Sequence, residues 1–98
     1  MLNITDVKNW LTKNEDEFEI VKYKITEKLQ HTDRQYYVHN LELEIEDEMI
    51  MFTDLEGIIW ELKSLLMGFY NDDITEIELE NDYFIIYLGT GYIQVRVV

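Results

Sequence analysis

Two rows of alternating glutamates form the most regular pattern of chemically active side chains in this 98-residue sequence. In each row, glutamates alternate with apolar residues, once over residues 41–46 and again over residues 76–80. This alternation is typical of a half-buried β-strand, so the glutamates of a row should share one face at intervals of about 6.6 Å. By our estimate from backbone geometry, that interval is comparable to the separation of successive phosphates along a nucleic-acid strand. The rows therefore predict a surface that can bind basic groups.

The expected binding residues combine charge with aromatic anchors. Tyrosine and carboxylate side chains together suit an arginine-rich partner, through ring stacking and paired hydrogen bonds. The anchors that we expect are Trp60 and the tyrosines, of which Tyr87 is the chosen candidate. The phosphate surrogates that we expect are Glu42, Glu44, Glu46, Asp47, Glu48, Glu76, Glu78 and Glu80. Two alternatives stay open: the rows are solvated faces that protect sheet edges, or the aromatic rings cover the core.

Candidate catalytic residues are few and poorly arranged. Gly89 and Gly91 form the only Gly-x-Gly, which lacks the third glycine and the helix of a dinucleotide loop and predicts a hairpin turn instead. The single serine, Ser64, has no strand-turn-helix elbow around it. His31 and His39 lack metal-ligand spacing, the acidic runs do not fit a calcium loop, and cysteine is absent. We therefore expect a non-enzymatic protein without metal or cofactor.

The net charge of -13 indicates the kind of partner. Residues 35–98 carry fourteen of the 21 carboxylates but only two bases, Lys63 and Arg96. Direct binding to nucleic acid or to an anionic membrane requires basic patches, so neither is expected. A basic protein is the natural complement, with mere solubility as the alternative. The N-terminal residues lack the basic and apolar regions of a signal peptide, and no apolar run could span a membrane, so we expect a cytoplasmic protein.

The strongest periodicity covers residues 54–70, where apolar residues recur at i, i+3, i+4 and i+7. This spacing predicts an amphipathic helix that Asp54 caps and that ends before Asn71. Trp60 and Met67 would lie on its far side, either covered by another element or free for a partner. The helix should pack its apolar stripe on a sheet.

The remaining elements complete the expected fold. A shorter helix should begin at Asn3 or Thr5 and end near Asn14. Strands are expected over residues 18–29, with a bulge between Ile20 and Val21, and over residues 36–46, 49–53, 74–80, 83–88 and 92–98. The prediction is one α+β domain over residues 1–98, with two helices and a mostly antiparallel sheet of five to six strands. Its expected order is α-β-β-(β)-α-β-β-β.

In size and charge the chain resembles phage anti-CRISPR and anti-restriction proteins, small acidic domains that occupy nucleic-acid-binding surfaces. No motif carries this resemblance, so it assigns no residue a role. It implies a DNA-mimicking inhibitor that blocks the basic surface of a nuclease or a similar nucleic-acid-binding protein. The alternatives are an immunity or antitoxin-like protein that caps a basic toxin, and a small structural subunit that forms homodimers.

Overall fold

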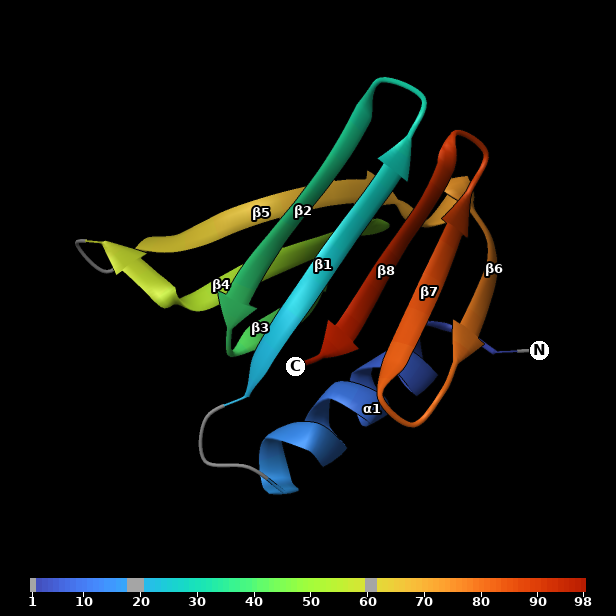
Figure 1. Cartoon of the computed structure of the whole chain (residues 1–98). Helices are drawn as coiled ribbons and strands as arrows, with labels where there is room; N and C mark the ends of the chain where they lie inside the picture. Colours follow the sequence, from blue (N-terminus) through green and yellow to red (C-terminus); the bar gives the residue numbers. More distant parts are fainter. Residues whose placement is uncertain (1, 18–20, 60–61) are drawn as a thin grey trace.

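A computed structural model describes residues 2–17, 21–59 and 62–98 of the chain. Within these ranges there is one α-helix, and eight strands form two antiparallel sheets (Figure 1). The elements are α1 (Ile4–Glu17), β1 (Lys22–Leu29), β2 (Thr32–His39), β3 (Leu41–Glu46), β4 (Met49–Ile59), β5 (Leu62–Tyr70), the short 3-10 helix η1 (Asn71–Asp73), β6 (Ile74–Leu79), β7 (Tyr83–Leu88) and β8 (Gly91–Val97). The α+β class with antiparallel pairing is confirmed, whereas the single sheet and the second helix are not.

The two sheets form layers whose strands cross (Figure 1). One sheet has five strands in the order β2-β1-β8-β7-β6, and the other has three in the order β3-β4-β5. The last strand pairs with the first one, and the Val98 amide donates to the Lys22 carbonyl at 2.9 Å. Phe84 of the larger sheet stacks on Phe52 of the smaller one, with ring centroids 6.4 Å apart. The core lies between the layers.

The helix expected over residues 54–70 is wrong, because residues 54–59 and 62–70 belong to the antiparallel pair β4–β5. Ile50 pairs with Phe69, and the Phe69 ring packs 5.9 Å from that of Phe52, so these apolar residues reach the core from paired strands. Register shifts interrupt the pair twice, and each shift breaks the two-residue period of a strand. The result imitates helical spacing. Gly57 and Gly68 argued against a helix here, since a glycine inside a helix destabilises it by about 1 kcal/mol.

Two further expectations depended on that helix. Met67, which that helix would have placed on the face opposite its apolar stripe, packs against the core. Trp60 lies outside the described residues. A separate expectation, the bulge between Ile20 and Val21, also falls outside them.

The strand expected over residues 36–46 is in fact two strands in different sheets. Asn40 separates them in a left-handed conformation with φ of 50°, which asparagine tolerates better than most residues. Its amide donates to the Val21 carbonyl at 3.0 Å. The break changes which side chains face inward: Val38 and Leu41 are both buried. An unbroken strand over residues 36–46 would have placed Tyr37 and His39 on the same face as Leu41, but with the break at Asn40 both are exposed.

The first helix is longer than expected and is capped at its start by Asn3. The Asn3 side chain accepts from the Asp6 amide at 3.3 Å, and the Asp6 carboxylate accepts from the Asn3 amide at 2.8 Å. The Trp10 indole donates to the Glu80 carbonyl at 2.7 Å, and its ring meets Phe84 edge-on at 5.0 Å. α1 is thus attached to the inner side of the five-stranded sheet. No helix of the described residues is long and apolar enough to cross a membrane.

Candidate protein-binding surface

The first glutamate row lies on β3, an edge strand of the three-stranded sheet. Leu41 and Leu43 are buried, so Glu42, Glu44 and Glu46 point to the outer face of that sheet. Exposure increases along the strand, from half-buried Glu42 to exposed Glu46. The sequence placed these three carboxylates correctly relative to one another.

The turn after β3 holds two adjacent acidic residues in left-handed backbone. Asp47 has φ of 48° and Glu48 has φ of 67°, which gives the two-residue β3–β4 turn the twist that favours tight hairpins. Non-glycine residues in this region carry strain of the order of 1 kcal/mol each. Strained residues cluster at functional sites, so this acidic turn is a candidate contact.

Replacement of Glu48 by glycine tests whether the turn stores strain. Glu48→Gly is expected to raise the free energy of unfolding by about 0.5–1 kcal/mol, because glycine adopts positive φ without steric cost. Urea unfolding of the variant and the wild-type protein measures this difference. Unchanged or lower stability would show that the backbone at Glu48 is not strained.

A second acidic turn, which sequence reasoning did not connect with the first, lies beside this hairpin. The Asn71 amide donates to the Glu48 carbonyl at 2.7 Å, so η1 meets the β3–β4 turn. This contact brings Asp72 and Asp73, both exposed, close to Asp47 and Glu48. Two acidic segments that are distant in the sequence thus adjoin at one corner of the smaller sheet. Only the tertiary pairing of β4 with β5 unites them.

Apolar side chains lie beside these acids on the same outer face. Met49 pairs with Tyr70, whose side chain is 58% exposed, and Met51 pairs with Gly68. A side chain at Gly68 would contact both methionines, at 3.4 Å from the Met49 sulfur and 3.6 Å from Met51 Cγ, so the glycine keeps this face open. A groove of about 280 Å³ is lined by Glu46, Asp47, Met49, Met51 and Tyr70.

We call the acids and apolar residues of this face, together with the adjoining Asp72 and Asp73 of η1, the β3 surface. Methionine is adaptable and tyrosine is enriched at protein interfaces, so the surface combines apolar anchors with negative charge. Its residues are Glu42, Glu44, Glu46, Asp47, Glu48, Met49, Met51, Tyr70, Asp72 and Asp73.

The helix α1 adds a further carboxylate to the β3 side of the protein. The pKa of Glu15 is raised above its ordinary value by partial burial, and further by the nearby charges of Glu42 and Asp16. A carboxyl whose pKa is raised on folding favours the folded state at low pH, and this contribution is lost as the pH rises through the folded-state pKa. Ionised Glu15 therefore opposes folding at neutral pH.

Neutralisation of Glu15 tests this repulsion. Glu15→Gln is expected to raise the free energy of unfolding at pH 7 by about 0.3 kcal/mol, a small value because the side chain is only partly buried and solvent screens its charge. The gain should vanish at pH 3, where both side chains are neutral. Urea unfolding at the two pH values measures it. An equal gain at both would assign the effect to packing.

The second glutamate row lies on β6, at the edge of the five-stranded sheet. Ile77 is buried on the inner face, so Glu76, Glu78 and Glu80 point outward. The two sheets pack through their inner faces, so the outer faces that carry the two rows look in opposite directions (Figure 1). The structure does not bring the rows together, and one flat partner cannot contact both.

Tyrosines and bases accompany the β6 row. Tyr87 pairs with Glu76 and with Tyr92, and no described element covers this outer face (Figure 1). The rings are half-buried rather than part of a second core. Desolvation and the neighbouring Glu78 raise the pKa of both Tyr83 and Tyr87. Tyr87 is thus remote from the β3 surface.

Cations dilute the negative charge of the β6 side. Arg96 contacts Asp82 at 2.9 Å and lies 4.8 Å above the Tyr83 ring. Lys24 and Lys28 extend from the same face two strands away from β7. The second row is therefore one margin of a face of mixed charge.

Sequence reasoning missed a buried carboxylate at Glu27, which is 1% exposed. Arg34 donates to it from Nη2 at 2.7 Å and from Nε at 2.9 Å, and the Tyr36 hydroxyl donates to it at 2.8 Å. Glu27 lies between Ile25 and Leu29 in the alternation of β1, on the side of the strand that faces inward. This position in the sequence was the indication that its side chain is buried. Because both oxygens have partners, this group joins β1 to β2 and is not poised for catalysis.

The described residues offer little for a metal or cofactor. No group of three or more histidine, aspartate or glutamate side chains among them could hold a metal ion. His31 lies in the β1–β2 turn and His39 at the far end of β2, and both are exposed. No protein-family model, curated protein or solved structure matches this chain. The functional argument therefore depends on the geometry of its surfaces.

Proposed function

We propose that the protein is a non-enzymatic inhibitor that binds a basic protein, through the β3 surface, and blocks the face by which that partner binds nucleic acid. The observation that supports this proposal is the groove between Glu46 and Tyr70, where two carboxylates adjoin two methionines and an exposed aromatic ring. Acids that flank an apolar anchor suit a surface of arginine and lysine with an apolar centre.

The β3 surface supports this function better than the β6 row does. On β3 and the following turn, five acids occur within seven residues, and Asp72 and Asp73 adjoin them. The β6 row shares its face with Arg96 and the lysines of β1, which would repel a basic partner that covers the whole face rather than its β6 margin alone. We therefore assign the primary contact to β3 and its turn, and we do not require both rows.

Affinity capture with a competitor tests the proposed function. The tagged protein would be incubated with lysates of bacterial hosts, including hosts that express CRISPR nucleases, and washed at low salt and at 0.5 M salt. At 0.5 M salt the Debye length is about 4 Å, so contacts that depend on exposed charges weaken. We expect a nucleic-acid-binding protein that excess DNA or RNA displaces and that the high-salt wash releases.

Two other results would redirect the proposal. Retention at 0.5 M salt of a partner that nucleic acid does not displace would favour the immunity-type alternative, in which a cognate toxin is held by a specific site. Capture of this chain alone would contradict inhibition and favour the homodimeric subunit.

A further inference from the structure

The strand β6 has one edge open for pairing. It is the last strand of the five-stranded sheet and pairs only with β7 among the described strands. The Glu80 amide donates to the Tyr83 carbonyl at 2.9 Å, which makes these two residues a hydrogen-bonded pair. Such pairs alternate with non-bonded ones along an antiparallel ladder. The N–H and C=O groups of Ile77 and Leu79 therefore point away from β7, toward the open edge.

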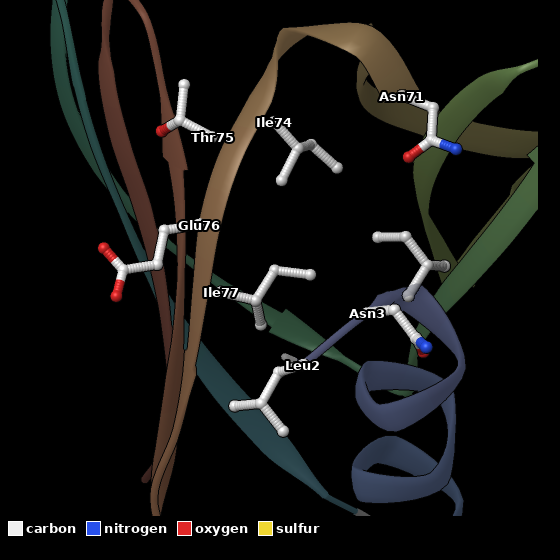
Figure 2. Close-up of a pocket in the computed structure, with 8 residues that line it drawn as sticks. Leu2, Asn3, Asn71, Ile74, Thr75, Glu76 and Ile77 are labelled. Carbon is white, nitrogen blue, oxygen red and sulfur yellow. The ribbon is translucent and has the colours of Figure 1, made fainter.

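A groove lies on the inner side of the same edge, where the amides of Asn3 and Asn71 accompany apolar side chains. Its volume is about 670 Å³, and its walls come from β6, from η1 and from the residues that start α1. Figure 2 shows Ile74 and Ile77 directed into this space, while Thr75 and Glu76 point to the opposite side of β6. Leu2, 41% exposed, forms the facing wall. The groove can thus take apolar side chains from a strand laid beside β6.

The outer side of the edge has the opposite character. Glu76 and Glu80 are exposed there and Glu78 is half-buried, all on one face. A strand added to β6 would alternate its side chains between the groove and these carboxylates. Cross-strand pairs of opposite charge stabilise a sheet, whereas like charges destabilise it.

We propose that β6 binds an extended peptide segment of alternating apolar and basic residues as an added antiparallel strand. Apolar residues opposite Ile77 and Leu79 exchange backbone hydrogen bonds with them and place their side chains on the groove side. The lysines or arginines between them lie beside Glu76 and Glu78. The backbone bonds supply affinity, and the alternation supplies specificity.

The charge of β6 selects this occupant over a second copy of the chain. Antiparallel pairing of β6 with β6 of another molecule would set two rows of glutamates side by side, and their repulsion opposes that pairing. This site lies on a different sheet from the β3 surface, and it does not depend on the function proposed above. Either assignment can fail alone.

The test uses an acetylated and amidated peptide of seven residues, lysine-valine-lysine-leucine-lysine-valine-lysine, with the isotope-labelled full chain. We expect amide resonances of β6 to shift on titration and the Ile77 and Leu79 amides to exchange more slowly with solvent. N-methylation of the valines and leucine removes the N–H groups that face β6 and should abolish binding. N-methylation of the two inner lysines, whose N–H groups point outward, is the matched control and should preserve it.

Charge variants of the protein complete the test. Glu76→Gln with Glu78→Gln should lower the affinity for the peptide about three- to tenfold, because two cross-strand ion pairs are lost. Glu46→Gln with Glu48→Gln, which removes the same charge from the β3 surface, should leave the affinity unchanged. Shifts that map to β3, equal binding of the two N-methylated peptides, or no shift in β6 at millimolar peptide would each overturn the proposal.

Discussion

Reversal of two charges on the β3 surface is expected to weaken the complex with the basic partner about 100-fold. The variant is Glu46→Lys with Glu48→Lys, and both wild-type side chains are exposed. Each substitution replaces attraction to the partner by repulsion, and a loss of about 1.4 kcal/mol at each position is tenfold in affinity. Isothermal titration of the partner captured from lysate, at low salt, measures the effect.

The control variant reverses the same number of charges on the opposite face. Glu76→Lys with Glu80→Lys also replaces two exposed acids, so the net charge of the protein changes equally. We expect a loss below threefold for this variant, because only long-range attraction is reduced. If the control weakens binding as much as the test variant, net charge alone drives association. If only the control weakens it, the partner binds the β6 side.

Removal of the Phe84 ring is expected to lower the free energy of unfolding by about 3–5 kcal/mol, the usual cost of a buried phenylalanine-to-alanine change. Phe84 is fully buried and touches the rings of both Trp10 and Phe52. One side chain therefore connects α1 and the two sheets. Domains of this size are stable by about 5–15 kcal/mol, so the loss is a large fraction of the total. Urea unfolding of Phe84→Ala measures it.

Tyr87→Ala provides the comparison for that variant. Tyr87 lies on the same strand but on the outer face, where it is half-buried. We expect this change to cost about 1 kcal/mol, since the ring contacts Tyr92 but fills no enclosed space. Equal losses for the two variants would contradict the placement of the core between the sheets.

Local patterns predicted the last three strands of the fold well. The strands near residues 74–80 and 92–98 follow from alternation, and the strand over residues 83–88 follows from a short run that is apolar on both faces. The turns at Asn81, Asp82 and Gly89 follow from their turn-forming residues. The segment 54–70 failed for a physical reason. Register shifts in β4 removed the alternation, and pairing with residues 49–54 outweighed the helical periodicity. Asn40 escaped notice because a single left-handed residue leaves little trace in composition.

The candidate surface was only partly predictable. Alternation with Leu41 and Leu43 was sufficient to place the glutamates of β3 on one face. It could not show that the β6 row faces the other way, because the crossing of two sheets is a tertiary property. The alternation also did not indicate that Asp72 adjoins the β3–β4 turn or that Met49 lines a groove. Both features depend on the pairing of β4 with β5.

Displacement of nucleic acid from the captured partner tests the central claim most directly. Labelled DNA or RNA bound to that partner would be titrated with the full chain while fluorescence anisotropy is recorded. We predict that anisotropy falls to the value of free nucleic acid near one equivalent of protein, and that Glu46→Lys with Glu48→Lys shifts this curve about 100-fold. Anisotropy that stays constant, or that rises because a ternary complex forms, would contradict a β3 surface that occupies the nucleic-acid site.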